Sequence, residues 1–451
     1  MANTFQRRFP RRLSQMQTIA IGFFIIILIG ALLLMLPFAS KTGEVTPFGT
    51  TIFTATSATC VTGLILVDTF THWSMFGQIV ILCLIQIGGL GFITFGFGIS
   101  ILLKRKISIR QRGMLKESVS VVDMGGIVKL AMIILKGTIL FEGIGAVILS
   151  ACFIPKMGVG TGIYYGIFHS VSAFCNAGFD LMGRFTPFSS LTGFYDNGVV
   201  IITIGLLILI GGIGFFVWND IYTHKLHVRR YALHTKIVLI GTLILTAGGA
   251  VLFYCLENQH LFADMTTSGK VLSSFFCAVT PRTAGFNSID SSALTESSKL
   301  LTIALMFIGG APGSTAGGIK ITTIVVLLLY LRSTLTRTES INIFKRRLEN
   351  GAVTKASAVF CVNLFSVLAA SFLICTIQNL DITDILFEVV SAISTVGMSL
   401  GITSDLTLAP KIILIFLMYI GRLGSLSFAL SFTDKKKLSH ISQPQEHISI
   451  G

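Results

Sequence analysis

Four short segments of the sequence share one spacing, a phenylalanine followed ten residues later by a glycine. They read FTATSATCVTGL, FHSVSAFCNAGF, FFCAVTPRTAGF and FEVVSAISTVGM, and their glycines are Gly63, Gly178, Gly285 and Gly397. Glycine permits unusual backbone angles and close approach, so it can turn backbone carbonyls toward a common axis. A ring of inward carbonyls can replace the hydration shell of a cation. One glycine alone would indicate helix packing, but four at one spacing favour a cation filter.

We predict that each of these glycines forms the filter together with the two residues before it. The candidates are Val61, Thr62, Gly63, Asn176, Ala177, Gly178, Thr283, Ala284, Gly285, Thr395, Val396 and Gly397. Asn176 and Thr283 also carry side-chain oxygens that are weak candidates for ion ligands, because amides and hydroxyls in such loops more often hold the local backbone.

Long apolar segments must position these loops. The chain of 451 residues is 53% hydrophobic and 12% charged, with a mean hydropathy of +0.83, which is typical of a polytopic membrane protein. A helix needs roughly 20 apolar residues to cross a bilayer. We predict eight transmembrane helices, over 18–36, 76–103, 127–153, 197–218, 237–256, 300–331, 356–377 and 411–432.

The predicted fold is all-α, with four repeats of span, re-entrant loop and span arranged pseudo-fourfold around one pore. The repeats cover 18–103, 127–218, 237–331 and 356–432, between an N-terminal segment 1–17 and a tail 433–451. A segment such as 48–58 suits a re-entrant half-helix better than a crossing. The C-terminal end of such a half-helix carries about half a negative charge, which would stabilise a cation at the centre.

The basic residues cluster at alternate ends of the predicted spans, at 7–12, 104–116, 225–236, 332–355 and 435–437. By the positive-inside rule, both termini are cytoplasmic. The net charge of +14 is therefore topogenic, and no basic and aromatic interleaving suited to nucleic acid is present. We expect membrane lipid to surround the helices.

Enzyme chemistry has little support in the sequence. The eight cysteines form no C-x-x-C pair, so neither a zinc site nor a disulfide framework is indicated. The motifs H-E-x-x-H and G-x-S-x-G and the P-loop are missing from the sequence. We therefore expect neither an enzyme nor a bound cofactor.

The second spans contain a further repeat, IGGLG, IGGIG, IGGAPG and IGRLG. Aligning them sets Arg422 where the other three have glycine, at a depth where an ionisable residue is a functional candidate. The third copy opens GGAPGSTAGG at 309–318, whose glycines and proline are the poorest helix formers. This predicts a loop that lines a cavity, with a merely kinked helix as the alternative. Lys136 and Glu142 are either a buried pair or face neighbouring helices.

The segments TCVTGL, CNAGF, VTPRTAGFN and STVGM resemble the filter loops of the Trk/Ktr/HKT superfamily of potassium transporters, over essentially the whole chain. The early first repeat is most similar to the bacterial Ktr membrane subunits, of the KtrB or KtrD type. The resemblance implies channel-like K+ uptake in the bacterial cytoplasmic membrane, by a homodimer with a cytoplasmic ring of nucleotide-binding KtrA or KtrC type subunits. Cys60, Cys175 and Ile393 depart from the usual filter sequences. Gly63 favours K+, because plant relatives with serine there prefer Na+.

The resemblance also implies an intramembrane gate. Its expected residues are Gly309, Gly310, Ala311, Pro312, Gly313, Ser314, Thr315, Ala316, Gly317, Gly318, Lys320 and Arg422. Nucleotide regulation must come from another polypeptide, because the chain has no G-x-G-x-x-G opening a βαβ unit.

Two alternatives remain at the level of sequence. A rocking secondary transporter usually carries inverted or bundle repeats, whereas all four units here have one orientation, which favours a pore. The sequence also allows Na+ to act as a coupling or activating ion and H+ to act as a coupling ion. A structural or receptor protein would need neither four filter-like loops nor a mid-membrane arginine.

Overall fold

The computed structural model describes residues 14–91, 94, 127–225, 227–338, 340–349, 351–425 and 446. Four stretches of the chain share one order of elements, a long helix, a short helix, an irregular loop and a further helix, and we call them units one to four. Unit one comprises α1 (Gln15–Leu34), α2 (Phe48–Thr59), α3 (Thr69–His72) and α4 (Met75–Leu90). Unit two comprises α7 (Ile127–Met157), α8 (Val159–Phe174), α9 (Gly198–Gly212) and α10 (Phe215–His224).

The other two units follow the same order, with one break. Unit three comprises α11 (Leu233–Glu257), α12 (Thr267–Val279), α13 (Glu296–Phe307) and α14 (Ile321–Leu335). Unit four comprises α15 (Ala352–Ile377), α16 (Ile382–Ile393) and α17 (Leu408–Leu423). Short 3₁₀ turns lie at Pro37–Ala39, Met182–Arg184, Thr192–Phe194, Val228–Arg230 and Ser291–Ala293.

The first helix of each unit is long and apolar enough to cross a membrane. These helices carry large apolar side chains that stay exposed, such as Phe24 on α1, Ile139 on α7, Leu243 on α11 and Phe372 on α15. A helix that is apolar on its outer face suits contact with lipid. The protein is therefore a polytopic, mostly helical membrane protein.

The number of spans stays a prediction. Within the described residues, four helices meet the criteria for a span, or five if the bent pair α9 and α10 counts as one. The helices α4 and α14 are apolar but shorter. The predicted spans 76–103 and 411–432 both run on beyond the described residues.

The predicted span 197–218 is not one continuous helix, because α9 and α10 meet at an angle of 93°. The bend lies at Gly214, whose φ of 93° suits glycine and not other residues. Just after it, the backbone N–H of Phe215 donates to the carbonyl of Gly313 at 2.8 Å. A Cβ on Gly214 would lie 2.8 Å from the carbonyl oxygen of Pro312. The chain therefore bends where a loop from unit three packs against it.

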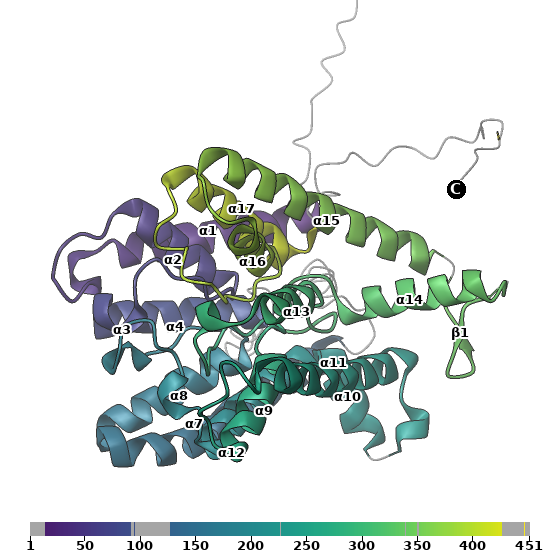
Figure 1. The fold of residues 1–451 in the computed structure, drawn as a ribbon, viewed down its shortest axis with the longest axis horizontal. Coiled ribbons are helices and arrows are strands. Elements are labelled where there is room, and N and C mark those ends of the chain that lie inside the picture. The colour runs from purple at the N-terminus through teal and green to yellow at the C-terminus, as the bar shows by residue number, and fades with distance from the viewer. Residues whose placement is uncertain are drawn as a thin grey trace, which may run out of the picture.

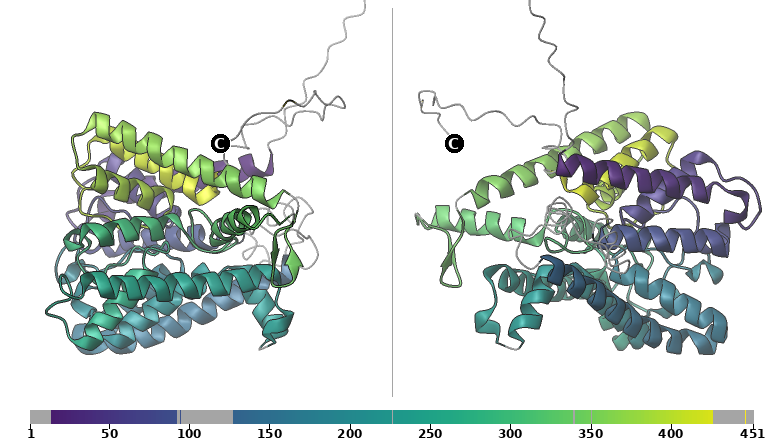
Figure 2. Two further views of the ribbon diagram at one scale, coloured as in Figure 1. Left: turned by 45° about the vertical axis from the view of Figure 1, so that its right-hand side comes forward. Right: turned by 180° about the vertical axis from the view of Figure 1, so that it is seen from behind.

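The expectation of an all-α fold also needs a small correction. Strands β1 (Asn342–Ile343) and β2 (Arg346–Arg347) pair antiparallel. With α14, this hairpin projects from the helical body (Figure 2). Strands of two residues are too short to leave a period-two pattern in the sequence.

The four short helices join the units into a closed order. Each packs against the helix that follows the loop of the preceding unit: α8 on α4, α12 on α9, α16 on α13 and α2 on α17. Units one and four accordingly lie side by side although they are the ends of the chain (Figure 1). Phe53, Phe168 and Phe387 of the repeated motif are fully buried, while in unit three Phe276 is the fully buried phenylalanine.

The predicted orientation rests largely on segments outside the described residues. The N-terminal segment 1–13, the basic clusters at 7–12, 104–116 and 435–437, and the tail from 433 apart from residue 446 all lie there. The cytoplasmic location of both termini stays a prediction.

Candidate functional site

Each short helix is followed by a loop with the same unusual backbone. The residue two before each motif glycine has a positive φ: 57° at Val61, 60° at Asn176, 69° at Thr283 and 51° at Thr395. Residues with side chains seldom adopt this conformation. The motif glycines also have positive φ, from 71° to 94°. Strain repeated four times at matching positions points to a functional constraint on the backbone.

The four loops converge. Each motif glycine faces the carbonyl that precedes the glycine of the next loop, in the pairs Gly63 with Ala177, Gly178 with Ala284, Gly285 with Val396 and Gly397 with Thr62. A Cβ added to Gly63 or Gly178 would lie 2.5 or 2.7 Å from that carbonyl oxygen. The order runs from unit one to unit four and back to unit one. The structure thus brings the four motif glycines and the residue before each of them together in one closed ring.

The motif glycines line a common cavity of about 490 Å³. Its walls also include the carboxyl-bearing residues Asp68, Asp180 and Asp290. We call it the vestibule. Asp68 is held by the backbone N–H groups of Phe70, Thr71 and Phe188, so it ties the loop of unit one to that of unit two.

Hydroxyl groups brace the loops, and the sequence analysis missed them. Ser57 accepts a hydrogen bond from the N–H of Gly63 at 3.0 Å, and Ser391 accepts one from Gly397 at 3.0 Å. Ser172 and Thr280 instead donate to the carbonyls of Phe179 and Phe286, each at 2.6 Å. A hydroxyl residue five or six positions before each glycine was the available signal.

The side chains of Asn176 and Thr283 bond to each other. In one orientation of the amide, Asn176 Nδ2 donates to Thr283 Oγ1 at 3.2 Å. In the other orientation, the amide oxygen of Asn176 accepts from the same hydroxyl at 3.2 Å. Either orientation joins the filter loop of unit two to that of unit three. This fits a role of the two side chains in holding the loops better than a role as ion ligands.

The first glycine of the IGG motif leaves room for the end of the short helix in units one, two and four. A Cβ on Gly88, Gly211 or Gly421 would collide with the carbonyl of Thr59, Phe174 or Ile393, which are the last residues of α2, α8 and α16. Unit three departs from this pattern, because a Cβ on Gly309 would instead lie 2.5 Å from the carbonyl oxygen of Gly317. The packing interpretation of these glycines is thus correct for three units.

The chain between α13 and α14 forms a loop that lies against the ring. Ala311 donates to the carbonyl of Gly212 at 2.9 Å, and Gly309 donates to that of Ile319 at 2.8 Å. A Cβ on Gly317 would collide with Thr395 of the fourth filter loop. All ten residues 309–318 therefore lie in one non-helical segment between units two and four.

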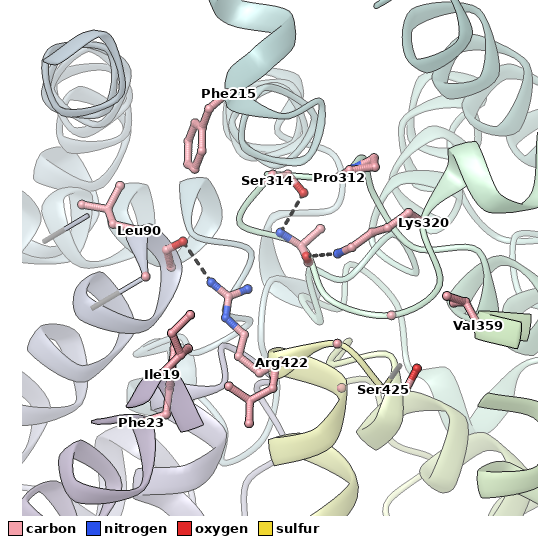
Figure 3. A pocket seen from close by; sticks show the side chains of 18 of the residues that line it. Ile19, Phe23, Leu90, Phe215, Pro312, Ser314, Lys320, Val359, Arg422 and Ser425 are labelled. Atoms are coloured by element: carbon pink, nitrogen blue, oxygen red, sulfur yellow. Dashed lines mark hydrogen bonds between the residues drawn. The ribbon is translucent and has the colours of Figure 1, made fainter. Parts of the chain in front are cut away.

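Two cationic side chains hold this loop. Figure 3 shows Lys320 bonded to the loop and Arg422 bonded to the end of α4. Arg422 donates to the carbonyl of Thr315, and also to those of Gly88 and Gly89 at the end of α4. Lys320 donates to Ala316 at 2.6 Å and to Gly317 at 3.1 Å. Both side chains line a second cavity of about 310 Å³, which we call the inner cavity.

The chain has extensive similarity to known transport proteins. A family model described as TrkH, cation transport protein, matches residues 2–441. The potassium/sodium uptake protein NtpJ of Enterococcus hirae is 42% identical, over 99% of each chain. The Ktr system potassium uptake protein B of Bacillus subtilis is 39% identical, over 98% of this chain and 97% of that protein.

Its fold also has a solved counterpart. The crystal structure of the potassium transporter TrkH from Vibrio parahaemolyticus matches with a TM-score of 0.73, at 17% identity, over 95% of this chain and 87% of that one. At that identity the match speaks for the fold alone. Because the family model covers nearly the whole sequence and two relatives exceed a third in identity, the chain belongs to the TrkH family of cation transport proteins.

Proposed function

We propose that this chain carries out channel-like K+ uptake through a filter made by its four glycine-containing loops. The observation that carries the proposal is the closed ring in which each motif glycine faces a carbonyl of the next loop. Backbone carbonyls around one axis can take over the coordination of a dehydrated cation. The short helices end beside the ring, and their C-terminal ends add negative potential there.

We also infer that eight spans surround the ring with pseudo-fourfold symmetry. Support comes from the equivalent packing of α8, α12, α16 and α2 on the preceding units. A pore on the axis would join the vestibule to the inner cavity. Both termini would be cytoplasmic, and the membrane would be the bacterial cytoplasmic membrane.

The gate we propose is the loop 309–318, with Lys320 and Arg422. Its contacts with Gly212 and Thr395 support a position between the filter and the inner cavity. Arg422 ties the loop to α4, and a fixed positive charge beneath the filter would oppose cation passage. Release of these carbonyls would open the pore.

K+ is the transported ion that we propose, because the relatives NtpJ and Ktr protein B are both named as potassium uptake proteins. The name of NtpJ includes sodium, so Na+ is our candidate coupling or activating ion. The name of the Ktr relative refers to a system, which supports a partner. We propose a homodimer on a cytoplasmic nucleotide-binding ring of the KtrA or KtrC type.

Ion flux in proteoliposomes tests the function. The purified chain should take up K+ faster than Na+, and a co-purified cytoplasmic partner should change the rate but not the preference. Equal slow leakage of both ions, from protein that is folded and correctly inserted, would overturn the proposal. Purification at low salt that repeatedly yields the membrane chain alone would overturn the partner.

A further inference from the structure

Glu142 belongs neither to the ring nor to the gate loop, yet it lies in the middle of the long helix α7. A carboxyl group inside a membrane protein is costly unless it has partners and a purpose. Lys136 is not its partner. It is exposed, and no ion pair between the two is found in the part of the chain that the structure describes.

The side chain of Glu142 contacts two other elements. Gln86 of α4 donates to its Oε2 at 3.2 Å. The thiol of Cys175, directly after α8, lies 3.8 Å from its Oε1 and 3.7 Å from the amide oxygen of Gln86. A thiol has one proton to donate, so the three side chains form a small network with a shared donor. Each carboxyl oxygen of Glu142 has a partner in it.

The backbone around Glu142 is fixed to the same place. Its carbonyl accepts a hydrogen bond from Ser170 of α8 at 2.7 Å. The neighbouring Phe141 stacks on Phe174, with the ring centroids 6.4 Å apart. Phe174 is the last residue of α8 and precedes Cys175. Helix α7 thus holds the end of α8 by polar and apolar contacts together.

Cys175 connects this network to the filter. It is fully buried and directly precedes Asn176, where the backbone enters its positive-φ turn. A Cβ on Gly89 would lie 2.6 Å from the Cys175 sulfur, so α4 packs directly against the thiol. Because Cys175 is covalently joined to Asn176, a displacement of Cys175 would move the start of the second filter loop.

We propose that Glu142 is a positioning residue for the second filter loop, acting through Gln86 and Cys175 on the carbonyls of Asn176 and Ala177. The inference rests on the proposed filter. It predicts that loss of Glu142 weakens the preference for K+ over Na+, and does not only reduce the amount of folded protein.

The test compares variants of the full chain in proteoliposomes loaded for K+ and Na+ uptake. Glu142→Ala should lower the K+/Na+ uptake ratio about fivefold, the factor that corresponds to one lost hydrogen bond. Glu142→Gln keeps an acceptor for one partner and should retain most of the ratio. Lys136→Ala, on the same helix but exposed, should leave it unchanged.

Cys175→Ala provides a second route if Glu142→Ala fails to fold. It removes the same anchor from the side of the loop and should also lower the ratio. In the double variant the ratio should fall no further than in the single ones, because coupled residues are not additive.

Two results separate this inference from the filter proposal. If Gly178→Ala changes the ratio while Glu142→Ala and Cys175→Ala do not, the positioning role is wrong and the filter stands. If none of the three changes it, the filter itself is wrong. A lower uptake rate with an unchanged ratio in Glu142→Ala would make its role merely structural and would also overturn the inference.

Discussion

Replacing the motif glycines by alanine, one at a time, should weaken the preference for K+ in an order set by the space around each Cα. The new Cβ would meet the carbonyl oxygen of the next loop most closely at Gly397, then at Gly285, then at 2.5 Å for Gly63 and 2.7 Å for Gly178. The K+/Na+ uptake ratio should therefore be lowest for Gly397→Ala and highest for Gly178→Ala.

The size of the effect follows from the displacement. Ordinary contact begins near 3.4 Å, so the facing carbonyl must retreat by about 0.7 Å at Gly178 and about 0.9 Å at Gly63. Forcing an extra carbon into a well-packed site and shifting the neighbouring backbone costs about 1–3 kcal/mol. If the strain falls on the K+-bound ring, the ratio drops by roughly fivefold to a hundredfold.

The matched control is Gly43, which lies in the loop between α1 and α2. Its φ is 74°, and a Cβ there would meet nothing within 4 Å. Gly43→Ala therefore carries the backbone strain without the displaced carbonyl. Measured side by side in proteoliposomes, Gly43→Ala should keep the ratio of the parent chain. Equal ratios in Gly43→Ala and the motif variants, or the reverse order among the motif variants, would contradict the proposed role of the facing carbonyls.

Three further outcomes are expected. Arg422→Gln should raise the initial rate of K+ uptake and reduce its dependence on a regulatory partner, with the K+/Na+ ratio nearly intact; a lower rate at normal expression would locate the gate elsewhere. Ser57→Ala leaves the buried N–H of Gly63 unpaired and should lower the free energy of unfolding by about 1–3 kcal/mol, measured by denaturant titration in detergent; an unchanged midpoint would count against the brace. Burial raises the pKa of Asp180 in the vestibule to about 6, so its carboxylate is lost as the outside pH falls through that value. The apparent affinity for K+ should fall as the carboxylate is lost. Asp180→Asn should have the low affinity at every pH. A pH-dependent change in affinity that persists in Asp180→Asn would contradict the role of Asp180.

The loops could be predicted because their pattern is local and occurs four times. The segment 48–58 expected as a half-helix matches α2 to within one residue, Phe48–Thr59. The Gly-Pro-rich run at 309–318 likewise marks a non-helical segment, because those residues oppose helix formation wherever they occur.

Features set by distant contacts could not be predicted in this way. The run GGIGFFVW around Gly214 is uniformly apolar, and its bend arises from packing against the unit-three loop. Alignment of the four IGG-type segments singled out Arg422. The alignment could not show that Arg422 reaches the carbonyls of Gly88 and Gly89 in unit one. The partners of Glu142 are 56 and 33 residues away in sequence, so no periodicity could reveal them.

The most direct test of the filter is to locate the ion. Rb+ can replace K+ in crystals of the chain and is visible by its anomalous scattering. An anomalous peak should lie on the axis between the four loops, within coordination distance of the carbonyls of Thr62, Ala177, Ala284 and Val396. A well-ordered ring with no peak there, and Rb+ bound at another place along the pore, would contradict the proposed filter.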